Sequence, residues 1–150
     1  MAIIRLTTEQ ANKQFGSIFK TPKKNKFGAK KVVIDNMKFD SKSEGDVYYD
    51  LKLQERQGLI ESFETQVKES FEAYGKHICN YYVDFKVYHN DGKIEFLEHK
   101  GIATPLFNVK WKLMLAKYDQ DIRDNKVICS INWYNKGKKT YGKRNLTLKK

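Results

Sequence analysis

Apolar and polar positions alternate most regularly between Tyr81 and Gly101, where two runs of aromatic and β-branched residues surround the turn-forming sequence Asn90-Asp91-Gly92. This pattern predicts a β-hairpin whose strands are Tyr81 to Tyr88 and Ile94 to Lys100. Because side chains of a strand alternate between its two faces, Glu98 and Lys100 share a face and His99 points the other way.

The length of the loop decides which residue faces Glu98. A two-residue loop would place Asp84 opposite His99, whereas the three-residue loop Asn90-Asp91-Gly92 places Asp84 opposite Glu98. Gly92 favours the longer loop, whose last residue takes a left-handed conformation that glycine adopts without strain. The predicted pairs are Asp84 with Glu98, Lys86 with Phe96, and Tyr88 with Ile94.

Two helices are predicted on either side of this hairpin. The first begins at Ser41, where Ser41-x-x-Glu44 matches a capping box, and ends near Gly58. The second begins at Thr104, with Pro105 as its first residue. Its apolar stripe comprises Phe107, Trp111, Met114, Leu115, Tyr118 and Ile122.

Further strands are predicted at Lys31 to Asp35, Leu59 to Val67 and Val127 to Trp133, while Phe71 to His77 has no clear pattern. A strand, a helix and a strand in succession form a right-handed crossover, so the strand from Val127 should run parallel to the one that carries Glu98. At 150 residues, the chain is long enough for one domain with a substantial core. We therefore expect an α/β fold with a central mixed sheet and helices on its faces.

Three acidic residues and one lysine are the candidate chemistry. Asp84, Glu98 and Lys100 should converge, and adjacent carboxylates that repel each other favour a divalent cation such as Mg²⁺. Glu44 has two explanations, because it completes the capping box yet also lies on the apolar stripe formed by Val47 and later residues. A carboxylate on that stripe needs a partner or a metal.

This arrangement, with the surrounding sequences FDSKSEGDVYYDL, IESFETQ, YYVDF and EHKG, resembles the PD-(D/E)XK nuclease superfamily, in particular phage endonuclease I type Holliday junction resolvases. The resemblance covers about residues 39 to 133, and Val83 replaces the usual proline before the first aspartate. It implies a restriction-endonuclease-like core and a Mg²⁺-dependent endonuclease, with Mn²⁺ able to substitute, that cuts branched or junction DNA.

The resemblance also implies a role for each site residue. Asp84, Glu98 and the backbone carbonyl of His99 would bind the metal, and Lys100 would orient the attacking water. Glu44 would bind a second metal or an outer-sphere water. Gln66 would support the metal ligands, although an ordinary surface glutamine is the simpler explanation.

The composition favours a polyanionic partner, because 29 basic against 18 acidic residues give a net charge of +11. Lysines are concentrated in two predicted basic arms, at about 20–31 and 135–150. The candidate DNA contacts are Lys23, Lys24, Lys26, Lys30, Lys110, Lys112, Lys138 and Lys139. The alternative function is that of a non-catalytic basic nucleic-acid-binding protein whose acidic cluster is structural.

Location and assembly are predicted from simpler features. The chain has two cysteines and no apolar stretch long enough for a signal peptide or a membrane span, so we expect a cytoplasmic protein, in the host cell if it is phage-encoded. Cutting both strands of a junction requires two sites, and the chain furnishes one. A homodimer is therefore expected.

Overall fold

The structure, a computed structural model, describes residues 30–135 and 140–147. The chain divides into two compact units, one ending at Lys42 and the other running from Ser43 to Lys150. The described part of the first unit is an antiparallel hairpin of β1 (Val32–Ile34) and β2 (Met37–Phe39). Its turn residues, Asp35 and Asn36, both have positive φ angles, as a type I′ turn requires.

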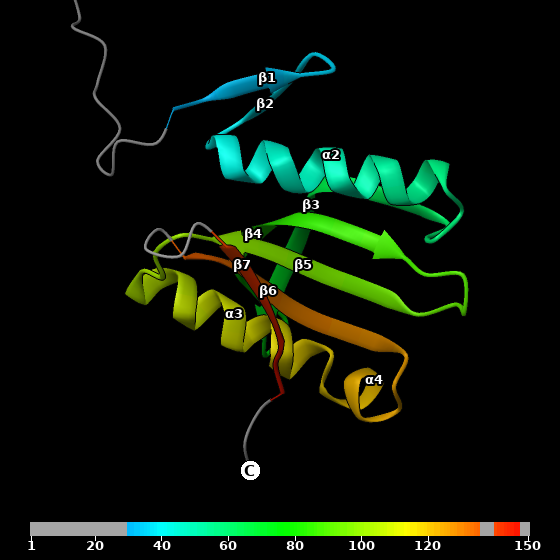
Figure 1. Cartoon of the computed structure of the whole chain (residues 1–150). Coiled ribbons are helices and arrows are strands. Elements are labelled where there is room, and N and C mark those ends of the chain that lie inside the picture. Colours follow the sequence, from blue (N-terminus) through cyan, green and yellow to red (C-terminus); the bar gives the residue numbers. More distant parts are fainter. Residues whose placement is uncertain (1–29, 136–139, 148–150) are drawn as a thin grey trace, which may run out of the picture. The chain divides into compact units, whose positions relative to one another are not determined.

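The second unit is built on a five-stranded mixed sheet with the order β3-β4-β5-β6-β7. Its strands are β3 (Ser62–Ala73), β4 (Lys76–Tyr88), β5 (Ile94–Lys100), β6 (Val127–Asn135) and β7 (Thr140–Asn145). Strands β5 and β6 run parallel, as predicted, and the other neighbouring strands of this sheet are antiparallel. Helix α2 (Lys42–Arg56) covers one face, and α3 (Pro105–Lys117) with α4 (Asp119–Arg123) covers the other (Figure 1).

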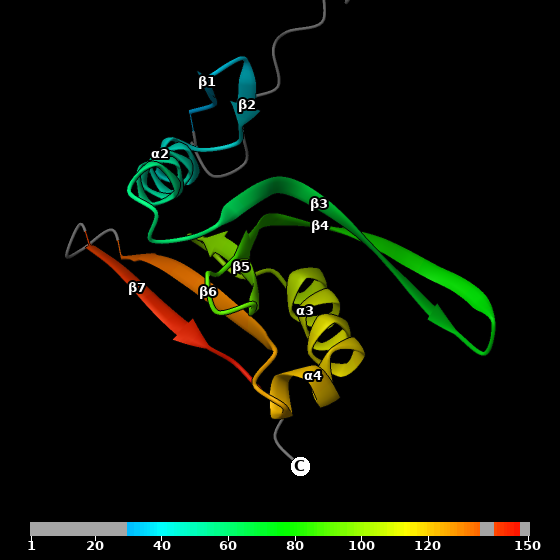
Figure 2. The ribbon, with the colours of Figure 1, turned by 90° about the vertical axis from the view of Figure 1, so that its right-hand side faces the viewer.

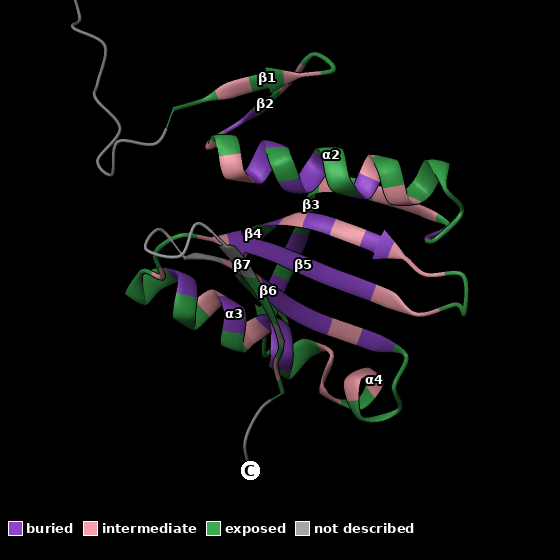
Figure 3. Ribbon diagram, in the orientation of Figure 1, coloured by how far each residue is buried: buried purple, intermediate pink, exposed green. Residues whose placement is uncertain are grey.

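This architecture confirms the predicted α/β class and is consistent with a restriction-endonuclease-like core. Buried residues line the middle strands and the inward sides of α2 and α3 (Figure 3). Strand β7 falls within the second predicted basic arm, which is therefore partly an edge strand. Among the described residues, no helix is both long and apolar enough to cross a membrane.

The helix ends follow the predicted local chemistry. Gly58 has a φ of +70°, and its amide and that of Leu59 donate to the carbonyls of Glu55 and Gln54, which closes α2 with a Schellman motif. At the start of α3, the Thr104 hydroxyl accepts a hydrogen bond from the Phe107 amide at 3.2 Å. These contacts define the C-terminal end of α2 and the N-terminal end of α3.

Helix α3 is shorter than predicted. It ends at Lys117, and Tyr118 interrupts the helical path with φ −105° and ψ 14° before α4 begins. The Tyr118 ring packs on Phe96 with a centroid distance of 4.8 Å, and its hydroxyl donates to Glu69 at 3.1 Å. The tertiary contacts of Tyr118 thus separate two helices where the apolar spacing alone predicts one.

The predicted register of β4 and β5 is confirmed. Lys86 pairs with Phe96 and Tyr88 pairs with Ile94. The His89 amide donates to the Lys93 carbonyl at 2.9 Å across a three-residue loop. Gly92 ends this loop with a φ of +82°, which is the left-handed conformation expected of it.

Strands β3 and β4 form a second hairpin, and both strands are longer than predicted (Figure 2). Strand β3 begins at Ser62 rather than Leu59 and continues to Ala73, and β4 begins at Lys76 rather than Tyr81. The unassigned residues 71–77 form the two strand ends and a turn of Tyr74 and Gly75, both with positive φ. Frequent charged residues in this part of β3 obscure the alternation on which the prediction depends.

The side chains of β3 that point to one face of the sheet at its start point to the other face further along. The Phe63 ring packs against Tyr48 of α2, whereas Glu69 accepts a hydrogen bond from Lys117 of α3 at 2.6 Å. Side chains an even number of residues apart share a face in a regular strand, yet these two contact helices on opposite faces of the sheet. Gln66 lies between them with a φ of +52°, which places the reversal at this residue.

Candidate active site

Asp84 and Glu98 lie where β4 separates from β5. The backbone ladder ends at the pair Phe85 and Leu97, and the next residues interact through their side chains. The Asp84 amide donates to Oε2 of Glu98 at 3.3 Å, and the His99 amide donates to Oδ2 of Asp84 at 2.9 Å. These exchanged bonds bring the two carboxylates together, as the predicted register requires.

Lys100 completes this end of β5. Its ammonium forms an ion pair with Oε1 of Glu98 and lies 4.8 Å from the centroid of the Phe107 ring. Burial alone would lower the pKa of Lys100, but the charges of Glu98 and Asp84 outweigh it and raise the pKa. The ammonium is therefore protonated and can donate hydrogen bonds, and it is a poor base.

Gln66 connects Glu44 to this pair. Its amide nitrogen Nε2 lies 3.2 Å from Oε1 of Glu44 and 3.4 Å from Oδ1 of Asp84, so it can donate to both carboxylates. Glu44 belongs to the first turn of α2 and is 7% exposed. Gln66 thus lies within hydrogen-bonding distance of both carboxylates.

The carboxylates of this cluster influence one another's protonation. Among the described residues, the ammonium of Lys100 lies close to three carboxylates, those of Glu44, Asp84 and Glu98. Burial, followed by the charges of Glu98 and Glu44, raises the pKa of Asp84 to about 8 against the opposing effects of Lys100 and the His99 amide. Asp84 therefore carries a proton near neutral pH unless a cation replaces it.

The donor set is chemically suited to a hard divalent cation. No group of three His, Cys, Asp or Glu side chains in the described parts of the chain is arranged as a metal cage. Mg²⁺ does not need one, because it keeps several waters and is commonly held by one or two carboxylates. Asp84 and Glu98 supply two adjacent carboxylates, so the residues present fit this ion.

Two further residues lie beside the cluster and had no distinctive signal in the sequence. The hydroxyl of Ser43 lies 2.8 Å from Nε2 of His99, and burial lowers the pKa of His99 to about 4, which keeps the imidazole neutral. Tyr81 is buried, and burial with the nearby charge of Glu98 raises its pKa far above the usual value. Neither spacing, from Ser43 to His99 or from Tyr81 to Glu98, follows a local periodicity.

The lysines predicted to contact DNA have different surroundings. Lys110 donates to the carbonyl of Asn80 at 2.9 Å and so connects α3 to β4, whereas Lys112 is exposed. Lys30 is exposed in the first unit. Five of the predicted DNA contacts lie outside the described residues: Lys23, Lys24, Lys26, Lys138 and Lys139.

Comparison with known proteins gives a family but no activity. No curated protein matches the chain. Residues 24–136 match the family described as "Protein of unknown function (DUF1064)". This match spans Glu44, Gln66, Asp84, Glu98 and Lys100 and covers well over half of the sequence. The chain therefore belongs to the DUF1064 family.

Proposed function

We propose that this protein is a metal-dependent endonuclease that cuts phosphodiester bonds in DNA, with branched or junction DNA as its substrate. The observation that carries the proposal is the cluster of Glu44, Asp84 and Glu98 around Lys100 at the point where β4 and β5 separate. The adjacent carboxylates of Asp84 and Glu98 favour a divalent cation, and the net charge of +11 favours a polyanionic substrate.

The metal would be held by Asp84, Glu98 and the His99 carbonyl, and Glu44 would bind a second metal or an outer-sphere water. Bound Mg²⁺ or Mn²⁺ polarises a phosphoryl oxygen and lowers the pKa of a coordinated water. Lys100, held protonated by its acidic neighbours, donates a hydrogen bond that orients the attacking water. Gln66 fixes the direction of the Glu44 and Asp84 carboxylates.

The assembly and setting follow from the same proposal. One site per chain makes one cut, so paired cuts across a junction require a homodimer. The two lysine-rich arms would hold the DNA phosphates or cross between the subunits. Such an enzyme would act in the cytoplasm, that of the host cell if the protein is phage-encoded.

One observation favours a second candidate function, that of a non-catalytic nucleic-acid-binding protein. The cluster is partly satisfied by its own members, because Lys100 pairs with Glu98 and the His99 amide donates to Asp84. On this alternative, the acidic residues stabilise the fold, and the basic arms alone provide the function. The two functions differ in whether divalent metal changes the DNA.

A cleavage assay separates them. Labelled linear, flapped, forked and four-way DNA is incubated with the intact protein over a Mg²⁺ titration, and the products are resolved on denaturing gels. We expect Asp84→Asn, Glu98→Gln and Lys100→Ala each to abolish cleavage while DNA binding is retained. Asp50→Asn is the matched control, since Asp50 is an exposed carboxylate of α2 that accepts a hydrogen bond from the Gln54 side chain at 3.0 Å. Undiminished cleavage by Asp84→Asn would exclude this site.

A further inference from the structure

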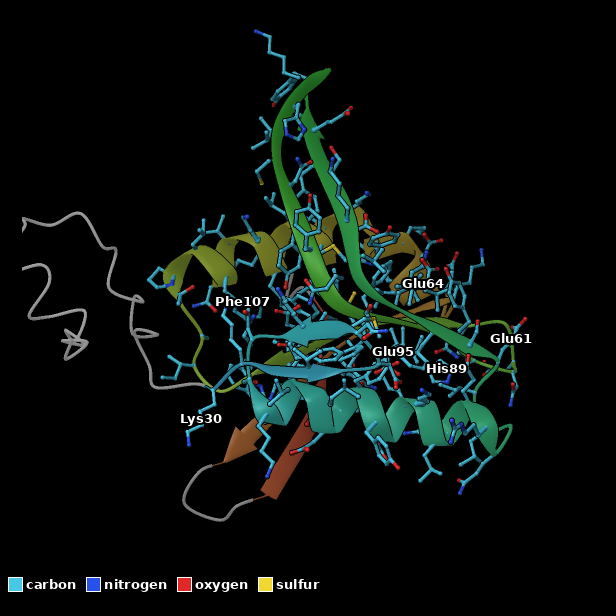
Figure 4. The ribbon with its side chains drawn as sticks, turned by 90° about the horizontal axis from the view of Figure 1, so that it is seen from above. Lys30, Glu61, Glu64, His89, Glu95 and Phe107 are labelled. Atoms are coloured by element: carbon cyan, nitrogen blue, oxygen red, sulfur yellow. The ribbon has the colours of Figure 1, made fainter. Side chains whose placement is uncertain are left out.

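The outer part of the β3–β4 hairpin, residues 67–83, forms a twisted ribbon that extends past α3 (Figures 2 and 4). We call it the distal ribbon. Helix α3 covers one of its faces, where Glu69 pairs with Lys117 and the Tyr81 ring lies 6.4 Å from that of Trp111. The opposite face, which we call the open face, carries the side chains that alternate with these, and they are largely exposed.

The open face starts at the candidate active site. Gln66 and Asp84 lie between the pairs Thr65–Phe85 and Val67–Val83 of the β3–β4 ladder. The next residues on the open face are Lys68 opposite Tyr82, and then Ser70 opposite Asn80. At the usual rise per residue, these two pairs are about 7 Å and about 13 Å along the ribbon from Gln66.

The chemistry of the open face suits a phosphate backbone. Its four side chains are an ammonium, two hydroxyls and a carboxamide, which are groups that commonly donate hydrogen bonds to phosphate and sugar. Lys68, Ser70 and Tyr82 are exposed, and within the described residues Lys68 forms no ion pair. The Ser70 hydroxyl also lies 3.1 Å from Nδ1 of His77, at the outer end of the same ribbon. From Gln66 toward the turn, the first carboxylate that β3 carries on this face is that of Glu72.

We propose that the open face of the distal ribbon binds the sugar-phosphate backbone of the nucleic acid on one side of the bond that is cut, with Lys68 contacting a phosphate and Tyr82, Ser70 and Asn80 donating beside it. This inference rests on the proposed function, because it takes the Asp84 site as the place of cleavage. The proposal gives a role to the distal ribbon, whereas most of the DNA contacts predicted from the sequence lie on the two basic arms.

Charge argues for this partner over a second copy of the chain. If two open faces packed together about a two-fold axis, each Lys68 would be buried against a face whose carboxylates, Asp84 at the candidate active site and Glu72 near the turn, lie at its two ends. A buried ammonium without a partner is costly, whereas a phosphate supplies the missing charge. The face is therefore complementary to a polyanion.

The test measures binding of fluorescein-labelled duplex and four-way DNA by anisotropy, in EDTA so that nothing is cut, over a range of KCl concentrations. Lys68→Gln should weaken binding roughly threefold to tenfold and reduce the slope of log K against log salt by about one. Lys68→Gln with Tyr82→Phe should weaken it further. The matched control is Lys126→Gln, which removes the same charge from a side chain that is 68% exposed near the start of β6.

Equal affinity and salt slope for Lys68→Gln and Lys126→Gln would overturn the ribbon proposal. A change in the oligomeric state of Lys68→Gln on sedimentation would also overturn it, because this face would then be an interface between copies of the chain. Thermal melts confirm that each variant is folded. A failure of the nuclease proposal is seen separately. In that case, Mg²⁺ produces no cleavage by the unmodified protein, while Lys68→Gln still lowers the salt slope.

Discussion

Replacing Asp84 with asparagine should stabilise the metal-free protein while strongly reducing its stabilisation by metal. In the folded protein the pKa of Asp84 is raised to about 8, from 3.8 in an unperturbed carboxyl group, mainly by burial and by Glu98. The folded state therefore holds a proton that the unfolded state releases, so folding becomes less favourable as the pH rises through this interval. Asparagine resembles the protonated acid and avoids that cost.

The size of the effect follows from the shift. At about 1.4 kcal/mol per pKa unit, the cost of the raised pKa near pH 7 is at most about 4 kcal/mol. Asp84 is partly exposed, and solvent screens its interactions, so we expect a gain of about 2 kcal/mol for Asp84→Asn. The gain should shrink as the pH is lowered from about 8 toward about 4, because the unfolded carboxyl group then also becomes protonated.

Urea denaturation in EDTA at several pH values measures this difference directly. Asp50→Asn, which changes an exposed carboxylate in the same way, should leave stability within about 0.5 kcal/mol. With Mg²⁺ at about 100 times its dissociation constant, the unmodified protein should gain about 3 kcal/mol and Asp84→Asn much less. A destabilised Asp84→Asn, or a gain that does not depend on pH, would refute the electrostatic account and favour a structural acidic cluster.

Three further predictions concern other parts of the structure. Gly92→Val should cost about 1–2 kcal/mol in urea denaturation, because the residue is left-handed at φ +82°, whereas Gly142→Val, at a position without positive φ or close neighbours, should cost less. Acidification from pH 7 to pH 5 should remove about 2 kcal/mol of stability through His99, whose pKa of about 4 lies below the unfolded value, and His99→Gln should lack this component of the pH dependence. Lys117→Met should lower the melting temperature by leaving the buried Glu69 carboxylate without its ammonium partner, and recovery is expected on changing Glu69 to glutamine as well.

Local chemistry was sufficient to predict much of the fold. The loop at Gly92 fixed the register of β4 and β5, and Thr104-Pro105 located the start of α3, because in each case a few neighbouring residues determine the geometry. The same register brought Asp84 and Glu98 together. Glu44 was accessible to prediction because its position on the apolar stripe of α2 is a feature of helical spacing alone.

The remaining features depend on contacts between distant residues. The outer halves of β3 and β4 are stabilised by α3, through pairs such as Glu69 with Lys117, so their own sequence shows little strand alternation. Tyr118 ends α3 because its ring and hydroxyl find partners on β5 and β3. The link from His99 to Ser43 spans 56 residues and follows no repeat. Such pairs are determined by packing and are not visible as a pattern.

Gln66 explains why the acidic cluster and the open face of the distal ribbon begin at the same place. A left-handed residue in a strand costs roughly 1–2 kcal/mol unless it is glycine, so glycine would be the least strained choice at a φ of +52°. Glycine, however, would leave Glu44 and Asp84 without the amide that can donate to both. The backbone reversal turns the even-numbered side chains of outer β3 away from α3, and the side chain of the same residue connects two carboxylates. The strain at Gln66 is therefore accompanied by a side chain that can donate to Glu44 and Asp84, which glycine could not provide.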